Sequence, residues 1–168
     1  MLLGILSDTH GDVPRTQAAV EIFRRKEVQE VVHCGDVGSR EVVKLLSEFR
    51  THYVHGNTDS RGSLRKAILE CGQTYYESVG ILVREGKQIA FLHGDDWRTY
   101  GELLHSQRFD LICSGHTHQF EWQMEGKTYL LNPGALHRTP SPSVAILELP
   151  AMRVCREMIK TGYYPSPT

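Results

Sequence analysis

Apolar and amphipathic segments alternate along the first 70 residues of the chain. Three apolar runs of strand length alternate with three segments that repeat apolar side chains at helical spacing: the runs are residues 2–6, 31–34 and 52–55, and the helical segments are residues 14–23, 42–49 and 64–69. Strand–helix units in succession are typical of a parallel sheet that helices cover. The first half of the chain therefore predicts an α/β fold.

The pattern changes after residue 79. Residues 80–83 and 88–92 flank the segment Arg84-Glu85-Gly86-Lys87, which predicts a hairpin with glycine in its turn. Further elements are expected as follows: a helix near residues 101–107, a buried strand at 111–113, and strands at 120–124, 128–131 and 144–149. The sequence contains no internal repeat and no linker, so residues 1–168 are predicted to form one mixed α/β domain. The tail from about residue 161 is expected to be frayed.

Composition narrows the class of protein. The 168 residues are 40% hydrophobic and 23% charged, as in an ordinary globular chain. Nineteen Lys and Arg against 20 Asp and Glu give a formal charge of −1, which argues against a dedicated nucleic-acid surface. The first apolar run is too short for a signal peptide, and no run approaches a membrane span of about 18 residues. We therefore expect a cytoplasmic protein that does not bind membranes.

Cysteine spacing supports the same compartment. The chain has no CxxC motif, so zinc-ribbon and thioredoxin-like motifs are absent from the sequence. The four cysteines are expected to be buried free thiols in a reducing cytosol: Cys34, Cys71, Cys113 and Cys155.

Side chains that bind metals follow the ends of five predicted strands. The carboxyl ends of parallel strands open onto one crevice, where ligands bind. We therefore expect seven side chains to converge: Asp8, His10, Asp36, Asn57, His93, His116 and His118. The pairs at positions 8 and 10 and at 116 and 118 point to the same side in an extended chain.

The donor set indicates the kind of metal site. Three carboxylate or amide oxygens and four imidazoles suit hard-to-borderline divalent ions. Seven ligands are too many for one tetrahedral ion and fit two ions that share one carboxylate. A single histidine or Gly-Asp pair is usually structural, so the common placement of the seven carries the prediction. The other histidines are interpreted as ordinary core or surface residues: His33, His52, His55, His105 and His137.

The chain contains, in this order, the motifs DxH, GD and GN, a downstream His, and GHxH; their ligand residues are Asp8 and His10, Asp36, Asn57, His93, and His116 and His118. In this set and order of motifs, the sequence resembles the calcineurin-like metallophosphoesterases. The similarity is strongest to their small, single-domain bacterial and archaeal phosphodiesterases, which Asn132-Pro133-Gly134 also resembles. It extends over about residues 1–150. The resemblance implies a four-layer αββα sandwich of two mixed β-sheets flanked by helices.

The resemblance also implies roles for the seven ligands. One ion would be bound by Asp8, His10, Asp36 and His118, and the second by Asp36, Asn57, His93 and His116, with Asp36 bridging. A metal-bound hydroxide held by Asp36 would be the nucleophile, with Asn57 and Thr58 near the substrate phosphate. Mn²⁺ is the expected metal, with Ni²⁺, Fe²⁺, Zn²⁺ and Mg²⁺ as alternatives.

One departure from the family motif bears on the substrate. The family has His after the Asn of GN, whereas this chain has Thr58, which is not a comparable acid. The resemblance therefore implies a divalent-metal-dependent phosphoesterase that hydrolyses small phosphodiesters in preference to monoesters. Two alternatives are a non-catalytic scaffold that binds proteins and a slow binder of a phosphate ligand. The expected partner is a small phosphate ester, and the sequence leaves a homo-oligomer open.

Overall fold

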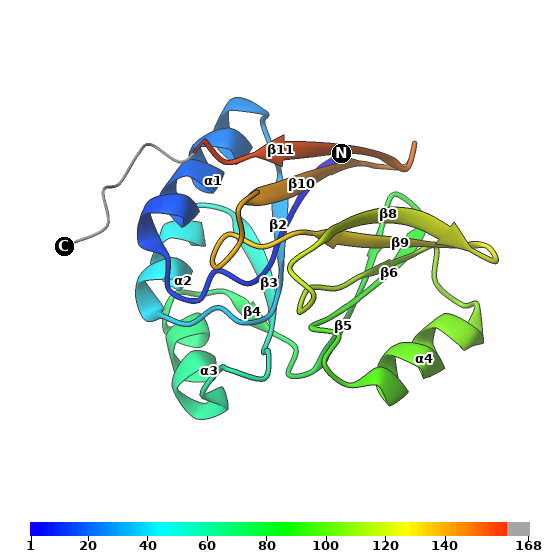
Figure 1. Ribbon diagram of the computed structural model, residues 1–168, viewed down its shortest axis with the longest axis horizontal. Coiled ribbons are helices and arrows are strands. Elements are labelled where there is room, and N and C mark those ends of the chain that lie inside the picture. The colour runs from blue at the N-terminus through cyan, green and yellow to red at the C-terminus, as the bar shows by residue number, and fades with distance from the viewer. Residues whose placement is uncertain (161–168) are drawn as a thin grey trace.

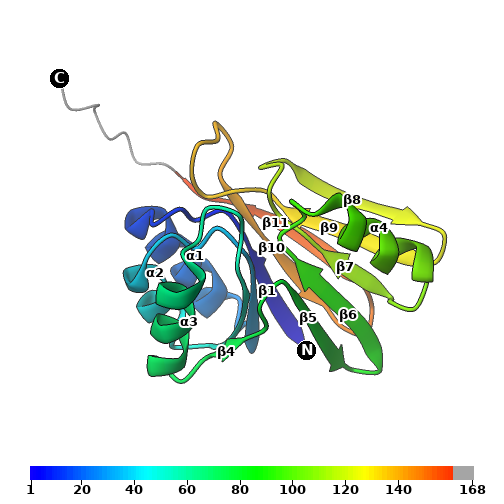
Figure 2. The ribbon, with the colours of Figure 1, turned by 90° about the horizontal axis from the view of Figure 1, so that it is seen from below.

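Two β-sheets face each other, and helices cover both outer faces (Figures 1 and 2). The computed structural model describes residues 1–160, so the tail that was predicted to be frayed lies outside the described residues. The first sheet has the order β11-β10-β1-β2-β3-β4 and contains β1 (Leu2–Leu6), β2 (Glu30–Cys34), β3 (Arg50–Val54), β4 (Thr74–Tyr75), β10 (Ser143–Glu148) and β11 (Arg153–Met158). The second has the order β5-β6-β7-β9-β8 and contains β5 (Val79–Arg84), β6 (Lys87–Leu92), β7 (Leu111–Cys113), β8 (Phe120–Glu125) and β9 (Thr128–Pro133).

Helices form the two outer layers. They are α1 (Val13–Arg25), α2 (Arg40–Leu46), α3 (Arg61–Glu70) and α4 (Trp97–Ser106). Figure 2 shows α1, α2 and α3 on the first sheet and α4 on the second. Both sheets are mixed. In the first, β1, β2 and β3 run parallel, and β10 pairs antiparallel with both of its neighbours, β1 and β11. In the second, β6, β7 and β9 run parallel, and β5 and β8 pair antiparallel with β6 and β9. The expected four-layer αββα sandwich is confirmed.

Three apolar layers hold the four layers of secondary structure together. Phe23 and Val43 belong to the layer between the first sheet and its helices. Ile5 and Phe91 are buried between the two sheets, and Leu104 of α4 packs on the outer face of the second sheet. Since β1 is covered on both sides, its side chains are buried from Leu3 to Leu6, which explains the continuous apolar run in the sequence.

Element boundaries differ from the sequence prediction at several places. The helix expected near residue 101 begins at Trp97, because Asp96 caps it by accepting from the backbone N–H groups of Arg98 and Thr99. The helix expected to reach residue 49 ends at Leu46. Strands β4 and β11 were not predicted: β4 has two residues, and β11 is a largely polar edge strand.

The cysteine prediction is partly wrong. All four thiols are free, but only Cys34 and Cys113 are buried; Cys71 is half-buried, and Cys155 is exposed on the edge strand β11. No helix among residues 1–160 is long and apolar enough to cross a membrane.

An ionic cluster at the amino ends of β2 and β3 connects the two sheets. Glu30 accepts from Arg84 Nε at 3.0 Å and Nη2 at 2.9 Å, and Arg84 ends β5 of the other sheet. His52 Nε2 lies 3.0 Å from the same Glu30 oxygen. His52 is therefore a structural histidine, as predicted, at the end of the strands away from the candidate ligands.

His33 is a second structural histidine, fully buried on β2. Thr9 donates its hydroxyl to the Val37 carbonyl, so its oxygen accepts from His33 Nε2–H at 2.9 Å. The ring stacks on Tyr53 with centroids 5.7 Å apart. Burial lowers the pKa of His33 to about 3, and this histidine is therefore neutral in the folded protein near neutral pH.

We expect His33 to make the fold sensitive to acid. Below pH about 6.5 the unfolded chain binds a proton at this position that the folded protein does not, so stability falls as pH falls, by up to about 1.4 kcal/mol per pH unit. Urea unfolding at pH 7, 6 and 5 measures the slope, and His33→Gln is expected to flatten it. Equal slopes for the two proteins would contradict this explanation.

Candidate metal centre

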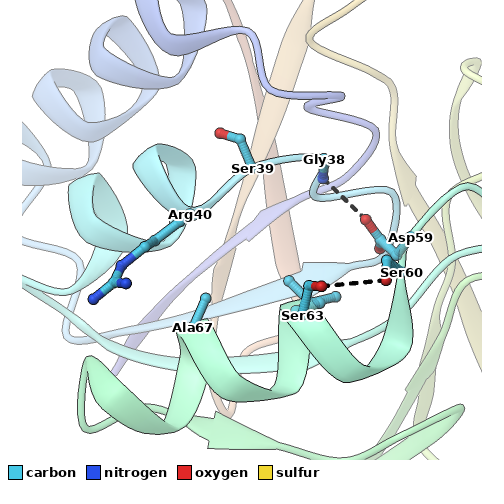
Figure 3. A pocket seen from close by; sticks show the side chains of 8 residues that line it. Gly38, Ser39, Arg40, Asp59, Ser60, Ser63 and Ala67 are labelled. Atoms are coloured by element: carbon cyan, nitrogen blue, oxygen red, sulfur yellow. Dashed lines mark hydrogen bonds between the residues drawn. The ribbon is translucent and has the colours of Figure 1, made fainter.

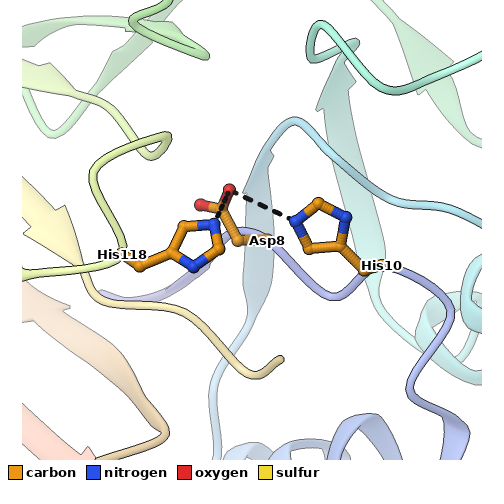
Figure 4. Close-up of side chains that lie close together, drawn as sticks. All are labelled: Asp8, His10 and His118. Atoms are coloured by element: carbon orange, nitrogen blue, oxygen red, sulfur yellow. Dashed lines mark ion pairs between the residues drawn. The ribbon is translucent and has the colours of Figure 1, made fainter. Parts of the chain in front are cut away.

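The loops that follow β1, β2, β3, β6 and β7 bring the seven predicted ligands to one edge of the sandwich. Asp8, His10 and His118 face one another there, from the loops after β1 and β7 (Figure 4). His118 Nε2 lies 3.1 Å from Asp8 Oδ1, and His10 Nε2 lies 3.9 Å from that oxygen. Asp8 is fully buried. The ligand atoms of these three residues all lie within 4.8 Å of one another, close enough to bind one ion.

A second group of ligand atoms is centred on Asp36. Asp36 Oδ2 lies 3.5 Å from His10 Nε2 and 3.4 Å from His93 Nε2. Asn57 Oδ1 is 3.1 Å from the same nitrogen of His93. Ligand atoms of Asp8, Asp36 and His93 also lie within 4.8 Å of one another. One carboxylate oxygen thus stands between two imidazoles from different loops.

His116 belongs to neither group. Its ring and the His93 ring form a T-shaped pair with centroids 5.1 Å apart, and its backbone N–H donates to Asp8 Oδ2 at 3.1 Å. The His116 side chain is therefore next to the second group, while its backbone orients the Asp8 carboxylate.

Backbone strain is concentrated at these ligands. Five of the eleven non-glycine residues with positive φ within residues 1–160 are predicted ligands: Asp8 (53°), His10 (43°), Asp36 (53°), His116 (66°) and His118 (60°). This left-handed region is unfavourable for residues with a side chain and recurs where function requires it. Asp and His adopt this conformation more often than other residues with a side chain, so the loops can place these five ligands in the left-handed region.

Hydrogen bonding fixes the orientation of His93. Its Nδ1–H donates to the Cys34 carbonyl at 2.8 Å, which directs Nε2 toward Asp36. Burial opposes protonation, but the Asp36 carboxylate and the Cys34 carbonyl outweigh it and raise the pKa of His93 to about 9. Burial alone would raise the pKa of Asp36, yet His93 and the Thr58 backbone N–H hold it well below its usual range. The Asp36 carboxylate is thus stabilised by a positive charge beside it, which protonated His93 or a bound cation supplies.

Asp59 connects the loop of Asp36 to the loop of Asn57. Its carboxylate accepts from the backbone N–H groups of Val37 (3.1 Å), Gly38 (2.9 Å) and Gly56 (3.0 Å). Figure 3 shows the bond to Gly38 at the edge of a cavity of about 140 Å³ between α2 and α3. Asp59 therefore positions two ligand loops from outside the ligand set, a role that the sequence prediction missed.

His137 is a second residue outside the ligand set that lies beside it. Its ring centroid is 5.7 Å from that of His10, and its backbone N–H donates to the Asp8 carbonyl at 3.1 Å. Its Nδ1 lies 3.3 Å from Asp12 Oδ2, the carboxylate that also caps α1. His137, interpreted from the sequence as an ordinary core or surface residue, thus lies at the border of the centre.

The residues present fit a divalent cation. Asp8 Oδ1 and His10 Nε2 are buried and have no hydrogen-bond partner within residues 1–160, although both face the other ligand atoms. Burial lowers the pKa of His10, and this effect outweighs the Asp36 and Asp8 carboxylates, which raise it. The lowered pKa favours the neutral imidazole that a metal ion needs as a ligand. Unpaired buried polar atoms are costly, and a metal ion would satisfy both of them.

The chain resembles known proteins in both sequence and fold. Residues 1–152 match the model of the calcineurin-like phosphoesterase superfamily domain. The chain is 28% identical over 154 residues to a phosphodiesterase of Methanocaldococcus jannaschii, covering 88% of this chain and 93% of that protein. A solved archaeal phosphodiesterase superposes with a TM-score of 0.86 at 24% identity, over 94% of this chain and 99% of that one. Vps29 of Entamoeba histolytica superposes with a TM-score of 0.68 at 20% identity, over 95% of this chain and all of that one.

Proposed function

Because the chain belongs to the calcineurin-like phosphoesterase superfamily, we propose that it hydrolyses small phosphodiesters with two divalent metal ions bound at this centre. The observation that carries the proposal is the position of Asp36 Oδ2, within 3.5 Å of His10 Nε2 and 3.4 Å of His93 Nε2. A carboxylate between two imidazoles is the arrangement that a bridging ligand requires. The similarity to the M. jannaschii phosphodiesterase favours diesters over monoesters.

The proposed ligand sets divide the seven side chains between two ions. The first ion would be held by Asp8, His10, Asp36 and His118, and the second by Asp36, Asn57, His93 and His116. Mn²⁺ is the proposed metal for this mixed oxygen and imidazole set. When bound, such ions lower the pKa of water and neutralise charge on the phosphoryl oxygens.

The chain itself contributes orientation and charge. The Cys34 carbonyl directs His93 Nε2 into the centre, and the His116 backbone N–H turns Asp8 toward His118. The Thr58 backbone N–H donates to Asp36 Oδ1 at 3.0 Å, which leaves Oδ2 directed at the two imidazoles. Preorganised groups of this kind need no rearrangement during the reaction.

Thr58 limits the range of leaving groups. In the proposed reaction the position that holds His in the family holds a hydroxyl that is not an acid near neutral pH. A missing proton donor typically costs 10²–10⁴-fold in rate, and the deficit is smallest for leaving groups that are stable as anions. Aryl phosphodiesters are therefore the substrates on which this protein should be most active.

The unpaired Asp8 and His10 atoms favour an enzyme over a scaffold. A protein that uses this fold only to bind partners has no need of seven metal-binding side chains at one edge. In this chain all seven are present, and buried ligand atoms are left without protein partners.

Hydrolysis of bis(p-nitrophenyl) phosphate and p-nitrophenyl phosphate by the purified protein tests the proposal. With Mn²⁺ we expect the diester to be cleaved faster than the monoester. Activity should disappear after chelation and return when Mn²⁺ is added back. No turnover with any divalent ion, or turnover that survives chelation, would contradict the proposed function.

A further inference from the structure

A groove of about 420 Å³ opens directly beside the predicted ligand His118. The loop after β7, the first residue of β8, the loop between β9 and β10, and β11 line it. Two guanidinium groups, Arg138 and Arg156, are among the lining residues, and no acidic residue is. The groove is thus basic and continuous with the candidate metal centre.

Arg156 is held in place by the groove wall. Its Nε donates to Ser143 Oγ at 3.1 Å, its Nη2 donates to the Ser141 carbonyl at 3.3 Å, and its Cζ lies 4.8 Å from the Phe120 ring centroid. These neutral partners fix the guanidinium without neutralising its charge.

Neither groove arginine forms an ion pair within residues 1–160. Arg24, Arg40 and Arg153 show the contrast, since each binds a glutamate carboxylate at 2.7–2.9 Å. The groove therefore presents two positive charges, one of them rigidly held, that are free to bind an anion.

A second pocket, of about 300 Å³, has the opposite character. Trp97 and Tyr100 of α4 line it together with Glu121 and Glu125 of β8, and no basic residue does. Thr117, between His116 and His118, lines both the groove and this pocket. The basic groove and the acidic, aromatic pocket therefore adjoin each other at Thr117.

We propose that the groove beside His118 is a subsite for a second phosphate group carried on one ester arm of the substrate. Arginine guanidinium groups bind phosphate with paired, charge-assisted hydrogen bonds, which Arg138 and Arg156 can supply. An anionic arm is therefore favoured in the groove over the adjoining acidic pocket. This inference rests on the proposed function and narrows its substrate class to diesters with a further phosphate.

Two chromogenic substrates with the same leaving group test the subsite. Thymidine 5′-(p-nitrophenyl phosphate) is compared with its 3′-phosphorylated form, and kcat/KM is expected to be at least about 10-fold higher for the latter. Arg138→Gln should reduce this ratio toward 1, and Arg156→Lys, which keeps the charge but loses the planar fork, should reduce it in part. The matched control Arg108→Gln, on the exposed loop after α4, should leave the ratio unchanged.

A measurement without turnover separates the subsite from the proposed reaction. In the metal-free protein, inorganic phosphate at millimolar concentration should shift the ¹⁵N–¹H signals of the Arg138 and Arg156 Nε groups and leave that of Arg108 unmoved. If neither ester is cleaved, the proposed function fails and these shifts still decide the subsite. A kcat/KM ratio near 1 in the unmodified protein, a ratio that Arg138→Gln does not change, or signals that phosphate does not move would each overturn the inference.

Discussion

Asp36→Asn is expected to lower kcat/KM for bis(p-nitrophenyl) phosphate by at least about 10²–10³-fold, the loss typical when a preorganised electrostatic group is removed. The asparagine side chain has nearly the same shape but lacks the charge, and only one of its two terminal atoms can act as a ligand. Asp36 Oδ2 faces both His10 and His93, so the change affects both groups of ligand atoms. The bound metal per chain should fall together with the activity.

Asp110→Asn is the matched control for this substitution. Asp110 binds Lys87 and the Gln88 backbone just before β7, at the opposite end of that strand from His116 and His118. We expect its metal content and turnover to match those of the unmodified protein. Near-normal turnover by Asp36→Asn would refute the assignment of this carboxylate as the bridging ligand.

Gly56→Ala should be almost as damaging, although glycine has no functional group. A Cβ at this position would overlap Asp36 Oδ1 and lie 2.5 Å from the Asp36 backbone nitrogen, because the loops after β2 and β3 pass each other without space for a methyl group. The Asp36 loop must therefore move, and we expect activity to fall by about 10²-fold or more, as for other misplaced catalytic groups, together with a loss of bound metal. Metal analysis and turnover on the same sample check this.

Gly62→Ala separates this clash from a general intolerance of alanine. Gly62 lies in α3, and no atom is within 4 Å of an added Cβ. Alanine is favoured over glycine inside a helix by up to about 1 kcal/mol, so this variant should be active and slightly more heat-stable. If Gly56→Ala were folded, as shown by a sharp thermal transition, and fully active, the close approach of the two loops would have no role in forming the centre.

The sequence predicts the site better than it predicts the ends of the elements. Continuous apolar runs such as Leu3–Leu6 identify strands that are buried on both faces, and the first one or two residues after each run then lie at the carboxyl edge of the sheet. This rule brings Asp8, Asp36 and His93 together without knowledge of their contacts. The arrangement of the two sheets in a four-layer sandwich was predicted from the family resemblance, because the periodicity of apolar residues does not show how sheets pack on each other.

Features that depend on contacts between distant segments could not be predicted. The Asp59 carboxylate accepts hydrogen bonds from backbone N–H groups about 20 residues earlier in the chain. The contacting residues Asp12 and His137 are 125 positions apart. Positive φ at His116 and His118 could not be predicted, because only a small fraction of histidines adopt that conformation even though histidine does so more often than most residues. Similarly, β11 is a strand because it pairs with β10, not because its largely polar side chains alternate.

Stepwise addition of Mn²⁺ to the chelator-treated protein, with bis(p-nitrophenyl) phosphate turnover and bound metal measured on the same samples, tests the central claim most directly. If two ions share Asp36, activity should rise until about two equivalents are bound per chain and then level off. Full activity with one equivalent or fewer, or no activity with both equivalents bound, would contradict a dinuclear phosphodiesterase.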